Sequence, residues 1–322
     1  MNLNRLEQDM LEGKRGEAVR LAMSIITTMG ELYGATRMIP VTQAHIDGCS
    51  YAAVWDAGLE FAEKLAALGA RVAVPTTLNI TARDIEDWRQ FRIPEDHALA
   101  CERMEAAYHA MGCIPTWTCA PYQYALAPGF GQQIAWAESN AINFANSVLG
   151  ARTHRYGDLV DICCAIAGRV PEFGLHLKEN RAGQVLIRFE GIEASVWNDN
   201  SIYAAAGYLA GEIAGERVPV LDGLPASTTH ENLKALSAAS ASSGAVGLFH
   251  VVGVTPEAPS LDEAFQGRRP AETVVVDGAS LRSATRSLTS IREGGSRTAG
   301  EAVDLVIVGC PHSSYMEVES VL

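Results

Sequence analysis

The chain has 322 residues, of which 48% are hydrophobic and 20% charged, a composition typical of a folded globular protein. Its formal net charge of −13 argues against nucleic-acid binding, because phosphate backbones are held by clustered Lys and Arg side chains. No apolar run approaches the ~20 residues that a membrane-spanning helix needs, and the polar segment Asn2–Gln8 lacks the pattern of a signal peptide. We therefore expect a cytoplasmic protein that binds neither nucleic acid nor membrane.

Helical and strand patterns alternate along the first half of the chain. Apolar residues recur at helical spacing in four segments, namely residues 1–35 with a break at Gly13, Ala53–Leu68, Glu95–Met111 and Gly131–Leu149. Two short apolar runs, Met38–Val41 and Arg71–Pro75, predict buried strands, and each is followed by a loop and a helix. This order predicts α/β units built on a parallel sheet.

The second half of the chain is less regular. Alternation over Gln184–Glu190 predicts an exposed edge strand. The remaining predicted elements are helices at Ser201–Ile213 and within Ser227–Ser243, and strands within Ala245–Val254, Thr273–Val276 and Asp304–Val308. No clean domain boundary is evident, so we expect two or more intertwined α/β units across residues 1–322. The last strand leads into a helix that has barely begun at Leu322, and we expect an unfinished sheet edge with exposed apolar side chains there.

Seven cysteines are scattered along the chain without a Cys-x-x-Cys pair, and their odd number disfavours a disulfide framework. Most are expected to be buried as small hydrophobic side chains. Cys119 and Cys310 differ, because each lies close to a proline in a loop before a predicted helix. A thiolate there is favoured by the helix dipole and by backbone N–H groups, as in a metal or cluster ligand, although a buried, inert cysteine in a tight turn fits the same pattern.

Polar residues gather where predicted strands end. Ligands of open parallel sheets bind beyond the carboxyl ends of the strands, which here are the segments His45–Ser50, Pro75–Asn79, the Cys119 loop and Gly309–Ser314. Glu138 follows in a predicted helix of small and apolar residues, where a carboxylate is either paired or functional, or else on a solvated face. His45 and Asp47 are turn formers that could also bind substrate.

Several of these segments together resemble one known family. Six blocks occur in the family's order, namely Ala44–Gly48, Val74–Asn79, Thr118–Tyr122, Ala135–Ser139, Asn146–Thr153 and Gly309–His312. Each is a weak signal alone, but in this order they resemble the large subunit of aconitase X from about Leu6 to the end of the chain. The resemblance implies an α/β fold with aconitase-like parallel sheets and flanking helices.

The resemblance also implies an activity, a cofactor and a set of site residues. Members are dehydratases that eliminate water from a small hydroxy acid, with an iron–sulfur cluster held by three cysteines. The iron acts as a Lewis acid on the substrate hydroxyl while a base removes a proton from the neighbouring carbon. The residues that match cluster ligands are Cys119 and Cys310, and those that match substrate contacts are Gly48, Cys49, Ser50, Asn79, Ile80, Glu138 and Ser139.

Parts of the family's pattern lie outside this sequence. The third cysteine ligand and a basic substrate-binding residue are expected beyond its end, and Cys113, Cys163 and Cys164 are the alternative ligands within it. A small swivel domain or subunit is the expected partner and the expected source of the catalytic base, so no catalytic base is assigned to this chain. A truncated, non-catalytic subunit that needs a partner is the alternative to an active enzyme.

Two substrates are known for the family, and the cluster type is left open. We expect cis-3-hydroxy-L-proline, with mevalonate 5-phosphate as the alternative, because a phosphate site favours several Arg or Lys side chains and the first two loops contain none. We also expect Ser50, Asn79, Cys119, Glu138 and Cys310 to converge on one cleft.

Overall fold

The computed structural model describes residues 1–124, 126–289 and 308–321, which form two compact units. Unit 1 comprises Met1–Ala145 and Leu149–Asn180, and unit 2 comprises Asn146–Val148 and Arg181–Leu322. The division falls where the sequence shows no linker. Both units are α/β, as predicted. The predicted strand Asp304–Val308 lies outside the described residues except for Val308.

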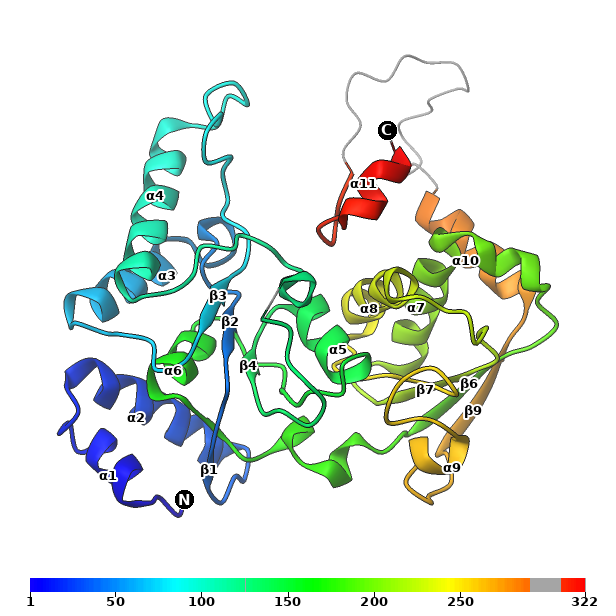
Figure 1. Ribbon diagram of the computed structural model, residues 1–322, viewed down its shortest axis with the longest axis horizontal. Coiled ribbons are helices and arrows are strands. Elements are labelled where there is room, and N and C mark those ends of the chain that lie inside the picture. The colour runs from blue at the N-terminus through cyan, green and yellow to red at the C-terminus, as the bar shows by residue number, and fades with distance from the viewer. Residues whose placement is uncertain (125, 290–307, 322) are drawn as a thin grey trace. The chain divides into compact units, whose positions relative to one another are not determined.

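The described residues of unit 1 form five short strands and six α-helices (Figure 1, blue to green). The strands are β1 (Met38–Pro40), β2 (Ala44–Ile46), β3 (Thr76–Leu78), β4 (Ala135–Trp136) and β5 (Arg169–Pro171). The helices are α1 (Arg5–Leu11), α2 (Glu17–Leu32), α3 (Tyr51–Ala67), α4 (Glu95–Ala110), α5 (Ser139–Ser147) and α6 (Val160–Ala167), with 3₁₀ turns η1 (Pro121–Gln123), η2 (Gly174–His176) and η3 (Lys178–Arg181).

A three-stranded parallel sheet in the order β3-β2-β4 forms the centre of unit 1. Ala44 of β2 is opposite Thr76 on one side and Ala135 on the other, so all three strands run in register. Every residue of the three strands is buried, and a core that includes Met23, Met104 and other fully buried side chains surrounds them. A separate antiparallel pair joins β1 to β5.

Two predictions for this unit are wrong. Arg71–Pro75 is not a strand, because its N–H groups bond to carbonyl groups near the ends of helices and not to another strand. Val72 N–H donates to the Met111 carbonyl, and Ala73 N–H donates to the Ala165 carbonyl. The strand β3 begins only at Thr76. The predicted helix Gly131–Leu149 is also wrong in its first half, because Ala135–Trp136 pairs with β2 and the helix begins at Ser139.

Unit 2 is built on a four-stranded parallel sheet in the order β8-β7-β6-β9. Its strands are β6 (Val185–Phe189), β7 (Pro219–Asp222), β8 (His250–Val251) and β9 (Glu272–Val276). Its helices are α7 (Asn200–Ala214), α8 (His230–Gly244), α9 (Leu261–Ala264), α10 (Gly278–Thr289) and α11 (Tyr315–Val321), with the 3₁₀ turn η4 (Ala194–Asn198).

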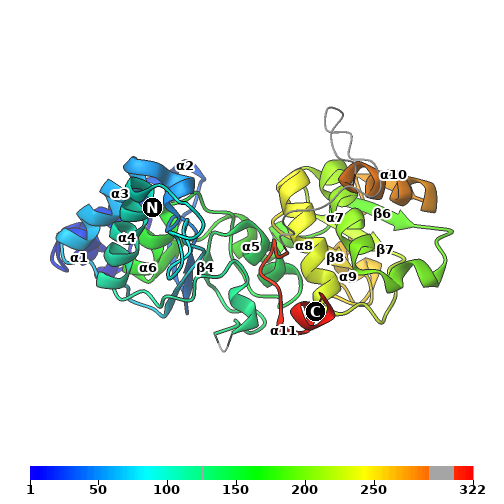
Figure 2. The same ribbon diagram turned by 90° about the horizontal axis from the view of Figure 1, so that it is seen from above.

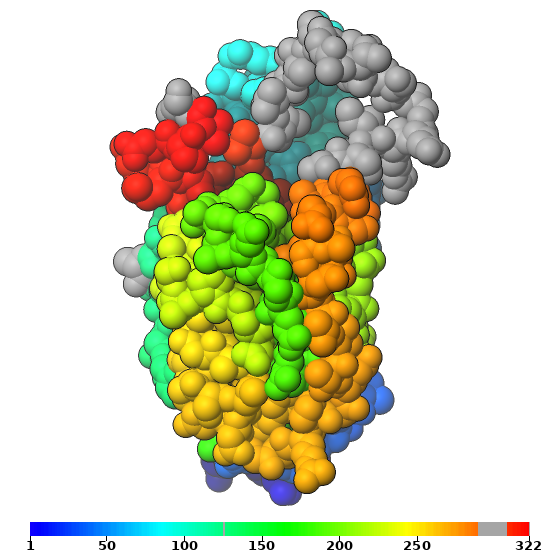
Figure 3. All heavy atoms as spheres, turned by 90° about the vertical axis from the view of Figure 1, so that its right-hand side faces the viewer, coloured from blue at the N-terminus to red at the C-terminus, as the bar shows by residue number. Residues whose placement is uncertain are grey.

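The prediction that Gln184–Glu190 forms an exposed edge strand is wrong. The strand β6 lies between β7 and β9, and four of its five residues are buried. The edge strands are β8 and β9, and β9, of which only Val276 is buried, lies at the surface in orange in Figure 3. Helices α7 and α8 lie side by side (Figure 2) at unusually close range. A Cβ atom on Gly207 would be 2.4 Å from the Leu236 carbonyl oxygen, so this contact requires glycine.

None of the helices in the described ranges is long and apolar enough to cross a membrane.

Candidate active site

The residues predicted to bind substrate follow the carboxyl ends of three neighbouring parallel strands of unit 1. Gly48, Cys49 and Ser50 follow β2, and Asn79 and Ile80 follow β3. Glu138 and Ser139 follow β4 in the same way. Parallel strands end at one edge of a sheet, which is where ligands of such sheets bind. The fold therefore brings all seven residues to one edge, called here the loop edge.

The first loop is packed against a helix that the sequence did not predict. A Cβ atom on Gly48 would be 3.0 Å from the backbone nitrogen of Leu159, so only glycine fits without displacing this segment. The Gly48 carbonyl accepts a hydrogen bond from the Tyr108 hydroxyl at 2.9 Å. The Cys49 thiol is buried and lies 3.4 Å from each of the Ile46 and Asn79 carbonyl oxygens. Cys49 thus presents its backbone, not its sulfur, to the loop edge.

The carboxylate of Asp161 accepts hydrogen bonds from the backbone of this loop. Asp161 was not identified from the sequence. Its Oδ2 accepts the Asp47 N–H at 2.6 Å and the Gly48 N–H at 3.4 Å, and its Oδ1 accepts the Ile162 N–H. The side chain is fully buried, and burial raises its pKa to about 7 in spite of these hydrogen bonds. Asp161 lies 114 positions from Asp47, so no local pattern could have linked the two.

The second loop is tied to the first through Asp47. Asn79 is buried, and its Nδ2 donates to Asp47 Oδ1, whereas Ile80 is partly exposed. Burial and the nearby Asp158 carboxyl, which also hydrogen-bonds to Asp47, together raise the pKa of Asp47 to about 6, although the hydrogen bond from Asn79 lowers it. His45, the other ambiguous residue, is a buried sheet residue whose Nδ1 lies 2.8 Å from Thr77 Oγ1.

Glu138 is at the N-terminus of α5 and not within a helix. Its carboxylate accepts the Ala141 N–H at 2.5 Å and the Ser139 hydroxyl at 3.1 Å. These contacts stabilise the charged form, but burial dominates and, with the charge of Asp47, raises the pKa of Glu138 to about 7. Glu138 can therefore be protonated or ionised near neutral pH, which is the property of a general acid, a general base or a hydrogen-bond donor to an anionic ligand.

Of the seven cysteines, the two predicted cluster ligands are the most accessible. Cys310 is exposed and Cys119 half-buried, whereas the other five are buried. Burial raises the thiol pKa of all five, to about 12 for Cys113 and Cys163. Because thiolate is the form that binds metal, Cys113, Cys163 and Cys164 are poor alternative ligands.

Cys119 belongs to the loop edge of unit 1. The Thr118 N–H donates to the Leu78 carbonyl at the end of β3, at 3.2 Å. The Asn140 Nδ2, in the first turn of α5, donates to the Cys119 carbonyl at 3.4 Å. These two bonds place Cys119 between the second and third loops.

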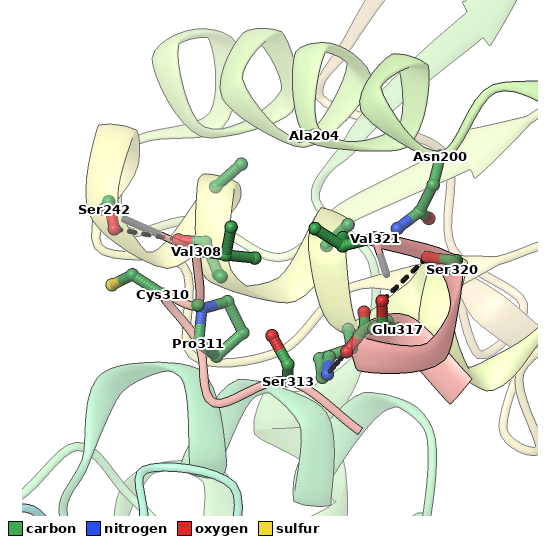
Figure 4. Close-up of a pocket in the computed structure, with 15 residues that line it drawn as sticks. Asn200, Ala204, Ser242, Val308, Cys310, Pro311, Ser313, Glu317, Ser320 and Val321 are labelled. Atoms are coloured by element: carbon green, nitrogen blue, oxygen red, sulfur yellow. Dashed lines mark hydrogen bonds and ion pairs between the residues drawn. The ribbon is translucent and has the colours of Figure 1, made fainter. Parts of the chain in front are cut away.

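Cys310 belongs to unit 2, in a segment anchored by a buried lysine. Lys234 of α8 donates to the His312 carbonyl at 3.0 Å and forms an ion pair with Glu317. Figure 4 shows Cys310 and Glu317 lining a pocket of about 460 Å³ beside α7 and α8. That Cys310 joins Cys119 in one cleft stays a prediction.

Comparison with known proteins decides the family. The model of the aconitase X first domain matches residues 1–179, and that of the aconitase X second domain matches residues 183–286. The chain belongs to the aconitase X family. The two matches meet where unit 1 gives way to unit 2, so the family's domains coincide with the compact units.

The relatives of this aconitase X chain carry two names. The cis-3-hydroxy-L-proline dehydratases of Pseudomonas aeruginosa and Hypocrea jecorina are 47% and 41% identical to it, over 98% of this chain and 52% of each relative. The phosphomevalonate dehydratase large subunit of Methanothermobacter thermautotrophicus is 41% identical, over 99% of this chain and 75% of the relative. The chain thus spans about half the length of the first two.

A solved structure matches the whole aconitase X chain. The crystal structure of Thermococcus kodakaraensis aconitase X in its holo-form has a TM-score of 0.85 and 34% sequence identity, covering 100% of this chain and 76% of that one. The predicted aconitase-like α/β fold with parallel sheets is therefore confirmed.

Proposed function

We propose that this chain is the substrate- and cluster-binding part of a hydro-lyase that eliminates water from cis-3-hydroxy-L-proline. The observation that carries the proposal is the convergence of the three predicted substrate loops on one sheet edge, in a family whose named relatives are dehydratases. Two relatives named for this substrate, at 47% and 41% identity, support the choice of substrate.

Elimination requires two groups to leave neighbouring carbon atoms. A base takes the proton from one carbon, its electron pair forms the double bond, and the C–O bond of the other carbon breaks to release hydroxide, which is protonated to water. A bound iron–sulfur cluster supplies Lewis acidity to the departing hydroxyl. Glu138, held by the first turn of α5, orients the substrate and can donate a hydrogen bond to it when protonated, since its pKa is raised to about 7. The catalytic base is assigned to a small partner domain or subunit.

Two of the cysteines are accessible enough to bind an iron–sulfur cluster. Cys119 and Cys310 would hold it, because their thiols are the least buried of the seven and both lie in loops that precede helices. Cys49, with its buried sulfur between two carbonyl oxygens, would instead shape the substrate loop. A third ligand is expected from outside these residues.

The proposal is tested on protein reconstituted anaerobically with iron and sulfide, together with a small partner subunit. We expect a broad visible absorption band and release of a pyrroline carboxylate from cis-3-hydroxy-L-proline. C119S should lose most of the band, whereas C101A, at a buried cysteine of α4, should keep it. If the enzyme converts mevalonate 5-phosphate and not hydroxyproline, mevalonate 5-phosphate is its substrate. If the chain binds no iron under any of these conditions, it is a non-catalytic subunit.

A further inference from the structure

Four carboxyl groups gather at the loop edge without a cationic partner. Asp47 lies within electrostatic range of Glu138, Asp158 and Asp161, and each of these negative charges either raises the pKa of Asp47 or has its own raised by Asp47. Across the described ranges of the chain, no Lys, Arg or His side chain forms an ion pair with any of the four. Where these carboxyl groups are ionised, their charge is balanced by no side chain of the described residues, so the cluster would bind a cationic group favourably.

Elsewhere in the same unit, buried or largely buried carboxylates have a cationic partner. Glu105 accepts from Arg83 Nε at 3.0 Å, and both side chains are largely buried. Glu7, which is 3% exposed, lies 3.3 Å from Arg169 Nε. The lack of a partner is therefore a property of the loop edge and not of unit 1 as a whole.

Asn79 supplies a second, independent sign of a missing donor. The residue is only 6% exposed, and its Nδ2 is used by Asp47. Its Oδ1 is buried and accepts no hydrogen bond from any residue that the structure describes. A buried acceptor without a donor is unfavourable by itself, and here it lies on the amide group that contacts Asp47. The amide group that donates to Asp47 therefore keeps an acceptor oxygen that a ligand N–H could use.

We propose that Asp47 is a substrate-binding residue, and that its carboxylate and the Asn79 amide oxygen together bind the positively charged ring nitrogen of a cyclic amino acid. A secondary ammonium group carries one positive charge and two N–H donors, which match one carboxylate and one amide acceptor. The inference rests on the proposed function and deepens it, because it names the feature that selects hydroxyproline. Mevalonate 5-phosphate offers only anionic and hydroxyl groups, and its charge would be repelled by the four carboxyl groups.

The test compares two ligands that differ only at this nitrogen. L-proline and cyclopentanecarboxylate are titrated calorimetrically into the assembled enzyme, with its cluster and any partner subunit in place. Neither ligand has the hydroxyl group that would be eliminated, so binding is measured without turnover. We expect wild-type enzyme to prefer L-proline by about tenfold or more, which is the usual effect of hydrogen bonds to a charged group.

D47N keeps an oxygen for Asn79 and removes the charge, so it should reduce this preference about tenfold. It should also raise KM for cis-3-hydroxy-L-proline more than it lowers kcat. N79L, which removes the amide oxygen at nearly the same volume, is an independent second variant that should reduce the preference too. D96N is the matched control, because Asp96 is an exposed carboxylate in the first turn of α4 and should leave the preference unchanged.

The outcomes separate this inference from the proposed function. If the enzyme dehydrates hydroxyproline but D47N and N79L keep the wild-type preference, the inference is wrong and the function stands. An equal loss of affinity for both ligands would make Asp47 a residue that positions the first loop, which also contradicts the inference. Competition between Mg²⁺ or Mn²⁺ and L-proline, abolished in D47N, would identify a metal site instead. If wild-type enzyme neither binds L-proline nor turns over hydroxyproline, the proposed function fails with it.

Discussion

Largely buried carboxylates have different partners in two regions of this molecule: a cationic side chain in one, and backbone N–H groups in the other. In unit 2, Glu257 meets the fully buried Arg181, whose Nε lies 2.8 Å from the carboxylate and whose Nη1 donates to Asn146 Oδ1 at 3.1 Å. At the loop edge of unit 1, the fully buried Asp161 carboxylate accepts hydrogen bonds from backbone N–H groups and pairs with no cation among the described residues. Burial raises the pKa of Asp161 to about 7.

This difference separates carboxylates that hold the fold together from carboxylates that are available to a ligand. An ion pair such as Arg181–Glu257 satisfies both charges and leaves nothing for a ligand to bind. Glu138 and Asp47 keep proton-binding and hydrogen-bonding capacity near neutral pH because no cation is provided for them within the described chain. The predictions below test this distinction, from the largest expected effect to the smallest.

Removing the cation of a buried pair should have the largest effect. R181M leaves Glu257 and the Asn146 carbonyl without their donors, and we expect a loss of about 3–5 kcal/mol in the free energy of unfolding. R103M is the matched control, because Arg103 and Glu63 form an exposed pair whose loss should cost less than about 1 kcal/mol. Urea denaturation followed by circular dichroism measures both. Equal losses would show that burial does not distinguish these pairs.

Removing a carboxylate at the loop edge should affect activity and not folding. We expect E138Q to lower kcat about 100-fold while it keeps the iron content and thermal stability of wild type, because in the proposed function the carboxylate orients substrate, and it has no ion pair to lose. E95Q, at an exposed carboxylate in the first turn of α4, is the control. If E138Q turns over substrate as fast as wild type, Glu138 serves only to cap the N-terminus of α5.

Sequence patterns predicted the longer helices better than the strands. The helix predicted at Glu95–Met111 is α4, Glu95–Ala110, because sixteen residues give enough turns for apolar spacing to show. The strands of unit 1 have only two or three residues, and alternation cannot be detected over Ala135–Trp136. Their positions depend on pairing with β2, which is a tertiary contact. For the same reason β6 was expected at an edge, although β9 covers it.

Motifs located the loops of the site but not the residue that holds them in place. The loops that contain Ser50 and Asn79 were expected after predicted strands, whereas Glu138 and Ser139 were expected inside a helix and were singled out by the family resemblance. Asp161 is in α6, among apolar residues, and only folding brings it to the first loop. Asp47 was left open between a turn former and a substrate-binding residue, because its lack of a cationic partner can be recognised only in three dimensions.

The smallest effect concerns the dependence of stability on pH, and it follows from the sign of the Asp161 pKa shift. In the unfolded chain this carboxyl ionises near its ordinary pKa of about 4, whereas in the folded protein burial raises its pKa to about 7. Between these values the folded state binds one more proton than the unfolded state, so the free energy of unfolding falls as pH rises. D161N has no such proton to lose.

The difference in unfolding free energy between wild type and D161N should therefore shrink by about 1–2 kcal/mol from pH 5 to pH 8, because an interior of effective dielectric constant near 20 reduces the full cost of the charge. Urea denaturation at several pH values measures it. The buried His45 titrates in both proteins and cancels in the difference. A difference between wild type and D161N that grows with pH would mean that Asp161 is stabilised as a carboxylate when the protein folds. The loop edge would then be balanced by its own backbone N–H groups, and the contrast with the ion pairs of unit 2 would disappear.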